Sequence, residues 1–273
     1  MSHALLEARD ISLGYPREGG WQEVLVRFDL QLAPGEVVTI LGPSGVGKSS
    51  LLRVLAGLQP PRSGSVTLHG QVLQGPHPRL AVAFQDPSLL PWLSLEKNVA
   101  FGLDFARQPK LAAAERRARI DHAISAVGLA HARNQYPAQL SGGMAQRTAL
   151  ARCLARQPEV LLLDEPFGAL DEVTRADMQQ LLLQLISTHN TAAVLITHDI
   201  DEALLLSDRV LLLGNHPAHI LGQWPIDLPQ PRAQRVEELG ALRIEILKTL
   251  RRASRTDETS SPSLPSEPAH VHG

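Results

Sequence analysis

The sequence predicts an α/β fold in which a core of parallel strands carries a mainly helical insertion. Short apolar strands alternate with helical stretches early in the chain and again in its second half, whereas strand signals vanish between Pro87 and Gln139. Such alternation is typical of parallel sheets covered by helices. With 273 residues the chain can bury a substantial core, and length alone permits one large domain or two small ones.

The composition is that of an ordinary soluble globular protein. The formal net charge is −2 and 44% of the residues are apolar, so no basic excess indicates nucleic acid as the main partner. The single cysteine, Cys153, excludes an internal disulfide and is expected to be buried in a helix. The N-terminus lacks a signal-peptide pattern, and no apolar run approaches the roughly 20 residues that a membrane-spanning helix needs.

The elements expected before the insertion are mostly strands. Strands are expected over residues 5–13, 24–32, 37–41 and 80–84, a hairpin over 65–73 and a helix over 49–58. Within 24–32 the apolar residues alternate, which predicts one buried face. That face consists of Val26, Phe28, Leu30 and Leu32.

The elements expected after residue 88 begin with an Ala- and Arg-rich helix over 111–127. The core resumes with strands over 160–163 and 193–197, a helix near 173–187 between them, and a hairpin over 209–224. A helix from about residue 233 to 252 follows. From residue 233 onward we expect a solvated appendage, and the alternatives are a contact to the second subunit or the membrane, or a role in regulating activity. The last residues, 254–273, are rich in Ser, Pro, Glu and Thr and are expected to be disordered.

A phosphate-binding loop follows the strand at 37–41. It fits the pattern G-x-x-x-x-G-K-[ST], and the strand before it and the helix after it argue against a chance Gly-rich turn. Glycines let the backbone wrap around a phosphate, the lysine supplies a cation, and the serine hydroxyl can bind Mg²⁺. The expected ATP-binding residues here are Gly42, Pro43, Ser44, Gly45, Val46, Gly47, Lys48, Ser49 and Ser50.

An Asp-Glu pair ends the apolar strand at residues 160–163. Mg²⁺ prefers oxygen ligands and keeps several waters, so a carboxylate is expected near the phosphates. We expect Asp164 to hold Mg²⁺ or one of its waters, and Glu165 to orient the attacking water and accept its proton. Such a pair alone is usually a polar boundary, but the phosphate loop favours the functional interpretation.

Six segments together resemble the motifs of the ATP-binding cassette (ABC) transporter ATPases, in that family's order. They are the phosphate loop, Gln85 in Ala83-Phe84-Gln85-Asp86, the signature Leu140-Ser141-Gly142-Gly143-Met144-Ala145-Gln146-Arg147, the pair Asp164-Glu165, Gly168-Ala169-Leu170-Asp171, and His198 in Ile196-Thr197-His198-Asp199. The resemblance covers roughly residues 5–228. It implies an α/β P-loop NTPase of the ABC ATPase type, with a RecA-like core and an antiparallel β subdomain.

The resemblance also implies how the chain is divided. The ATPase domain would span residues 1–228, with the helical subdomain inserted at about 88–157. A helical extension over 229–253 and a disordered tail over 254–273 would follow.

A head-to-tail dimer is a further implication of the resemblance. Each ATP would lie between one copy's phosphate loop and the other copy's signature residues, Ser141, Gly142, Gly143 and Met144. These residues begin a helix expected over 144–156, whose N-terminus would face the γ-phosphate. Ser141 could also cap its own helix, and the two roles are compatible.

The resemblance assigns the remaining site residues. It implies a catalytic set of Glu165, His198 and Gln85, and a metal set of Ser49, Gln85 and Asp164. His198 would contact the γ-phosphate, although a strand-end histidine bonded locally is the default outside this context. Gln85 would contact Mg²⁺ or the water, and Asp171 would reach across the dimer.

Two aromatic residues compete for the adenine of ATP. Tyr15 is the expected stacking partner. The segment over residues 16–23 is longer than usual in this family, so Trp21 stays the alternative.

A more specific resemblance lies beyond Gln85. Residues 87–95 and 98–103, together with 75–78 and 227–232, resemble importer ATPases for nitrate, sulfonate, taurine and related compounds. An exposed Leu89-Leu90-Pro91-Trp92 patch would suit a groove that receives a helix from a membrane subunit. Packing between the helical subdomain and the core is the alternative.

Together these resemblances imply the ATP-hydrolysing subunit of an importer, a homodimer that uses ATP and Mg²⁺. Implied partners are two integral membrane permease subunits at the cytoplasmic face of the inner membrane and, indirectly, a solute-binding protein; nucleic acid is not expected. The alternative is a non-transport ABC ATPase acting on nucleic acid or ribosomes, but the sequence has one cassette, no sustained heptads and no basic tract. Nitrate, alkanesulfonates, taurine and a thiamine precursor all stay open as solutes.

Overall fold

The computed structural model describes residues 4–105, 107–168 and 170–260. Ala169, within the expected Gly168–Asp171 motif, and the expected disordered residues 261–273 lie outside this part of the chain. The elements are β1 (Leu6–Arg17), β2 (Gly20–Leu32), β3 (Val37–Leu41), α1 (Lys48–Leu55), β4 (Ser63–Leu68), β5 (Gln71–Val72), β6 (Leu80–Ala83), α2 (Leu95–Ala100), α3 (Ala113–Ala126), α4 (Gly142–Leu154), β7 (Val160–Asp164), α5 (Glu172–His189), β8 (Ala192–Thr197), α6 (Ile200–Leu206), β9 (Arg209–Gly214), β10 (His219–Pro225) and α7 (Val236–Ser260).

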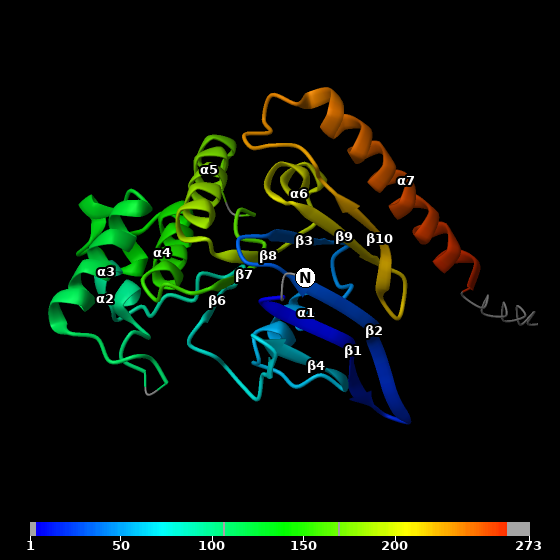
Figure 1. Ribbon diagram of the computed structural model, residues 1–273, viewed down its shortest axis with the longest axis horizontal. Coiled ribbons are helices and arrows are strands. Elements are labelled where there is room, and N and C mark those ends of the chain that lie inside the picture. The colour runs from blue at the N-terminus through cyan, green and yellow to red at the C-terminus, as the bar shows by residue number, and fades with distance from the viewer. Residues whose placement is uncertain (1–3, 106, 169, 261–273) are drawn as a thin grey trace, which may run out of the picture.

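The larger sheet forms the core and has the strand order β10-β9-β3-β8-β7-β6. Five of its strands run parallel, and β10 pairs antiparallel with β9. Every residue of β3, β7 and β8 is buried, as expected for strands with covered faces on both sides. Figure 1 shows α5 and α6 above this sheet and α1 below it. The α/β class predicted from the sequence is therefore confirmed.

Alternate residues of the central strands belong to two separate cores. Val160 and Leu162 of β7 pack toward α1 and the second sheet. Leu161 and Leu163 pack toward α5 and α4. Period-two alternation thus continues inside fully apolar strands, and the carboxyl ends of these strands are held rigidly at one edge of the sheet.

The second sheet is antiparallel, with the order β2-β1-β4-β5. Its first hairpin is longer than predicted, because pairing continues from Leu6 with Leu32 to Arg17 with Gly20. One part of the predicted buried face is also wrong: a register shift beside Arg27 buries Leu25 and leaves Val26 only half-buried. The two sheets join where Val26 N donates to Ala218 O at 2.9 Å.

A helical layer of α2, α3 and α4 lies at one end of the molecule (green in Figure 1). It is inserted between β6 and β7, as the fold class predicts. α4 also packs on β6, where the Cys153 Sγ donates to Val82 O at 3.3 Å. Burial raises the pKa of the Cys153 thiol to about 11, which keeps the thiol protonated and confirms its predicted burial.

The C-terminal helix α7 differs from its prediction in length and in packing. It extends to Ser260, although residues from 254 onward were expected to be disordered; the sequence has no Pro or Gly between Gly240 and Pro262 to end it earlier. α7 contacts α6, β9 and β10, and its Ile246 is completely buried. The expectation of a solvated appendage is therefore wrong for this segment.

Within residues 4–105, 107–168 and 170–260, none of the helices combines the length and the apolar character that spanning a bilayer requires.

Candidate functional site

The predicted phosphate loop connects β3 to α1. Gly45 and Gly47 have φ angles of 80° and 101°, in the left-handed region that favours glycine. A Cβ on Gly42 would lie 2.7 Å from the Leu213 carbonyl oxygen, so only glycine fits there. The first turn of α1 contains no acidic residue, and no side chain caps it. Its free N–H groups can therefore donate hydrogen bonds to a bound anion.

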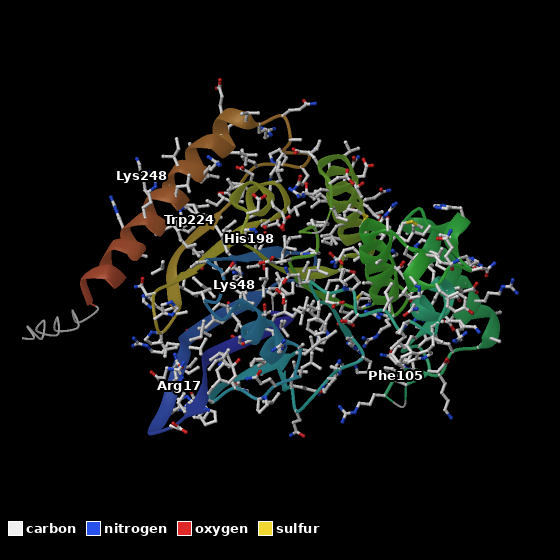
Figure 2. All side chains as sticks on the ribbon, turned by 180° about the vertical axis from the view of Figure 1, so that it is seen from behind. Arg17, Lys48, Phe105, His198, Trp224 and Lys248 are labelled. Atoms are coloured by element: carbon white, nitrogen blue, oxygen red, sulfur yellow. The ribbon has the colours of Figure 1, made fainter. Side chains whose placement is uncertain are left out.

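Lys48 lies inside this loop and is 5% exposed. Its Nζ donates to Gly42 O at 2.8 Å and to Pro43 O at 2.9 Å. The pKa of Lys48 is lowered from its ordinary value, mainly because the ammonium group is buried. The negative charges of Glu165 and Asp164 oppose this shift. Figure 2 shows Lys48 and His198 near the middle of the molecule, with Arg17 and Phe105 at its periphery. The loop thus holds a cation beside two carboxylates and beside the free N-terminus of α1.

Asp164 ends β7 and is buried. Burial raises the pKa of its carboxyl group, and a hydrogen bond from the Ser49 side chain opposes this shift. A carboxylate and a hydroxyl in contact next to a phosphate-type loop fit Mg²⁺, which takes oxygen ligands and keeps waters. In the described part of the chain no three His, Cys, Asp or Glu residues form a metal cluster.

Glu165 is the centre of a three-residue arrangement. Its Oε1 lies 3.1 Å from His198 Nδ1, and its Oε2 accepts from Gln85 Nε2 at 3.3 Å. The three residues follow β7, β8 and β6, which are adjacent in the sheet. Glu165 itself has a φ of 45°, and its N–H donates to Ile196 O at 2.9 Å. The structure therefore brings together all three residues of the predicted catalytic set.

The predicted signature begins α4. This helix starts at Gly142, earlier than expected, with Ser141 as its N-cap: the Ser141 Oγ accepts from Met144 N at 3.3 Å. Ser141 and Gly142 are exposed, and a Cβ on Gly143 would lie 3.3 Å from the Leu170 side chain. The local capping role of Ser141 is thus real, and the helix N-terminus also faces outward.

Asp171 is the N-cap of α5. Its carboxylate accepts from Thr174 N at 3.0 Å and from Thr174 Oγ1 at 2.7 Å, and these bonds lower its pKa. Within one chain, Asp171 therefore acts as a helix cap.

The two aromatic candidates lie on opposite faces of the β1–β2 hairpin. Tyr15 pairs with Gln22, and its Oη lies 2.6 Å from the Ser50 Oγ on α1. Trp21 pairs with Pro16 and lies over Gly14, so that a Cβ on Gly14 would be 2.2 Å from the indole nitrogen. The Arg62 guanidinium stacks 4.7 Å from the Trp21 ring centroid. Only Tyr15 faces the phosphate loop.

Two acids beside His198 were missed from the sequence. The Asp199 Oδ1 accepts from Asp201 N at 2.9 Å and from Glu202 N at 3.2 Å, which caps α6. Glu202 is buried, and burial raises its pKa to about 7. The pattern Asp-x-x-Glu at a helix start was the available signal.

Residues 25–168 match the ABC transporter family. The aliphatic sulfonates import ATP-binding protein SsuB 2 of Burkholderia lata is 46% identical over 248 residues, which cover 90% of this chain and 88% of that protein. The nitrate import ATP-binding protein NrtC of Synechococcus elongatus is 44% identical over 244 residues, 87% of this chain but 37% of NrtC. A dimeric ATP-binding cassette, MJ0796, bound to ADP and Pi, aligns with a TM-score of 0.73 at 28% identity, covering 82% of this chain and 100% of that structure.

Proposed function

Because the chain belongs to the ABC transporter family of ATP-binding proteins, we propose that it is the ATP-hydrolysing subunit of an importer for a small solute such as a sulfonate, taurine or nitrate. The observation that supports this proposal most is the contact of Glu165 with both His198 and Gln85 beside the phosphate loop. These three groups are those that an ATP-hydrolysing site needs around its attacking water.

The phosphates of ATP bind at the N-terminus of α1. The free N–H groups of the loop and the Lys48 ammonium hold the negative charge, and Lys48 exchanges its carbonyl partners for phosphate oxygens. Ser49, Asp164 and the Gln85 amide would hold Mg²⁺, which would neutralise phosphate charge there. Adenine stacks on Tyr15, whose side chain is on the α1 side of the hairpin.

Glu165 is the residue that activates water. It is 17% exposed, so one edge of its carboxylate is open to solvent while two neighbours fix its direction. Glu165 orients the water and takes its proton, and His198 contacts the γ-phosphate from the adjacent strand end. Such proton transfer typically contributes roughly a hundred- to ten-thousand-fold to a rate.

The second half of each site comes from a second copy of the chain. Ser141 and Gly142 are exposed at the N-terminus of α4, which has no acidic residue in its first turn. A helix N-terminus of this kind binds an anion, here the γ-phosphate held by the partner's loop. Asp171 directly follows Leu170, whose side chain packs beside Gly143 of the signature. From there Asp171 reaches the partner across the interface.

The segment over residues 87–93 is the proposed docking surface for a membrane subunit. Asn98 is buried and holds it: the Asn98 Oδ1 accepts from Leu90 N at 2.8 Å, and its amide donates to Leu90 O and Leu93 O. Arg152 donates to Pro87 O and Ser88 O. Trp92 is nevertheless 69% exposed, which argues against the packing alternative.

On this proposal the chain binds two permease subunits, served by a solute-binding protein, at the cytoplasmic face of the inner membrane. ATP binding closes the dimer, and hydrolysis with phosphate release reopens it.

Replacing the base tests the proposed function. In Glu165→Gln the carboxamide keeps the shape but cannot accept the proton, so turnover falls by roughly a hundredfold or more while ATP binding is retained. An ATP-bound dimer then accumulates, which size-exclusion chromatography with bound nucleotide measures. Glu245→Gln, an exposed change on α7, is the matched control and keeps normal turnover. Normal turnover in Glu165→Gln would overturn the assignment.

A further inference from the structure

The helix that follows His198 is short and is covered by the end of the chain. α6 has seven residues and begins two positions after His198. Residues 226–250, which we name the C-terminal strap, cross over it; Ile226 and Ile246 are buried against Ala203 and Leu204 of α6. Leu41, the last residue before the phosphate loop, belongs to the same apolar cluster. Figure 1 shows α7 of this strap (orange) running past α6 and β10.

Arg232 of the strap holds the C-terminal end of α6. Its side chain is 2% exposed, and its guanidinium donates to the carbonyls of Leu204 (3.4 Å) and Ser207. It also donates to Leu228 O at 2.8 Å and Ile226 O at 3.2 Å within the strap. A cation at the C-terminal end of a helix donates hydrogen bonds to carbonyls that have no partner inside the helix. It also interacts favourably with the negative end of the helix dipole.

Two further side chains of the strap complete this hold on α6. The Gln230 Nε2 donates to Leu205 O at 2.8 Å, again at the last turn. At the other end, the Arg243 Nε lies 2.8 Å from the Asp201 Oδ1 in the first turn of α6. α6 is therefore fixed at both ends by residues that come 25 or more positions later in the chain.

His198 needs such support because its own side chain is poorly held. It is 60% exposed, and its ring contacts Glu165 from the outer side. The direction of the ring is thus set by the backbone between β8 and α6. A shift of α6 would move the ring, and displacing a catalytic group by about 1 Å can cost roughly a hundredfold in rate.

We propose that the C-terminal strap positions His198 by fixing α6, and that Arg232 and Arg243 are positioning residues for ATP hydrolysis. This inference rests on the proposed role of His198. It gives the segment after residue 226 a part in the catalytic unit, although that segment lies outside residues 25–168, which carry the family match.

The experiment compares variants of the full-length chain at the exposed end of the strap, where folding is least at risk. The Arg243 and Asp201 side chains are 48% and 61% exposed, and exposed ion pairs contribute little to stability. Because the hold of an exposed pair on α6 is weak, Arg243→Ala is expected to lower kcat about two- to fivefold, with an unchanged KM for ATP and an unchanged Tm. Arg243→Lys and the charge swap of Arg243→Asp with Asp201→Arg are expected to restore most of the rate. Lys248→Ala, on the outer side of α7 (Figure 2), is the control with normal kcat.

A spectroscopic readout separates positioning from general stability. In Arg243→Ala the NMR resonances of the His198 ring are expected to shift, and in Lys248→Ala they stay in place. A kcat for Arg243→Ala equal to that of Lys248→Ala would overturn the inference, as would a loss that follows Tm and is not restored by lysine.

His198→Ala distinguishes this failure from a failure of the proposed function. If His198→Ala loses turnover and Arg243→Ala does not, only the role of the strap is overturned. If His198→Ala keeps normal turnover, the proposed role of His198 fails as well.

Discussion

The two glutamates beside His198 have opposite surroundings. Glu165 lies at a strand end, where its two oxygens meet His198 and Gln85 and one edge is open. Glu202 lies four residues after His198 in α6 and is 6% exposed, and its Oε1 has no hydrogen-bond partner among the described residues. A hydrogen bond from Thr197 and the charges of Arg175 and His198 oppose the effect of burial on its pKa. Glu165 is therefore suited to exchange a proton with water, whereas Glu202 is suited to keep its proton.

The buried Glu202 predicts a pH-dependent contribution to stability. Its pKa rises from the ordinary 4.5 to about 7, so between these values the folded chain binds a proton that the unfolded chain has released. The free energy of unfolding therefore falls as pH rises through this range, and the loss is complete above pH 7. At about 1.36 kcal/mol per unit, the shift corresponds to about 3 kcal/mol.

Glu202→Gln removes the buried acid. We expect the variant to be more stable than the unmodified chain at pH 8 and equal to it near pH 4.5, because a carboxamide carries no charge to desolvate. Urea unfolding at the two pH values measures the difference. Glu245→Gln is the exposed control with no such dependence. An identical stability difference at both pH values would show that Glu202 does not titrate in this way.

At the scale of elements, the β1–β2 hairpin determines which of its two aromatic residues faces the phosphate loop. Tyr15 and Trp21 are equally exposed, at 43% each, so exposure does not separate them. The strand register does, because Tyr15 pairs with Gln22 while Trp21 pairs with Pro16, on the opposite face. Tyr15 thus faces Ser50, whereas the Trp21 ring packs against Gly14 and the Arg62 guanidinium.

Substitutions in the hairpin test this assignment. Tyr15→Ala is expected to raise the Kd for ATP about five- to hundredfold, since base stacking on an aromatic ring contributes roughly 1–3 kcal/mol. Tyr15→Phe keeps the ring and should bind nearly normally, although it loses the contact with Ser50. Titration with ATP by calorimetry gives the Kd values. Trp21→Ala is the matched comparison, and a larger loss of affinity in Trp21→Ala than in Tyr15→Ala would reverse the assignment.

At the scale of the whole molecule, one chain presents two half-sites on different elements. The phosphate loop precedes α1, which packs between the two sheets, whereas the signature begins α4 in the helical layer. The proposed function takes the missing half of each site from a second copy of the chain. A two-fold symmetric pairing, in which the loop of each copy meets the signature of the other, gives two equal sites.

Mixing two inactive variants tests this arrangement. Lys48→Ala disables a chain's own loop, and Ser141→Arg disables the signature that it offers to its partner. In a mixed dimer one site loses both halves and the other keeps both, so activity is expected to return to at most about a quarter of the unmodified level for random pairing. Steady-state phosphate release measures it, with each variant alone as the control. Absence of recovery, when both variants still dimerise with ATP, would contradict the head-to-tail dimer.

Much of this protein can be predicted from local sequence. The strands over 37–41, 160–163 and 193–197 are short, mostly apolar runs, which are typical of buried parallel strands. The phosphate loop is equally local, because the conformations of Gly45 and Gly47 depend on glycine itself. The proposed catalytic residues Glu165 and His198 could be predicted because each directly follows such a strand.

Other features depend on contacts between distant segments, and only the tertiary structure decides them. The burial of Glu202, the opposite faces of Tyr15 and Trp21, and the hold of Arg232 and Arg243 on α6 all depend on strand register or on helix docking across many residues. Local patterns cannot encode them, since the same amphipathic helix can face solvent or a neighbour. The sequence by itself determined the chemistry at the strand ends; the packing of the strap and the hairpin decided how that chemistry is supported and which side chains can reach it.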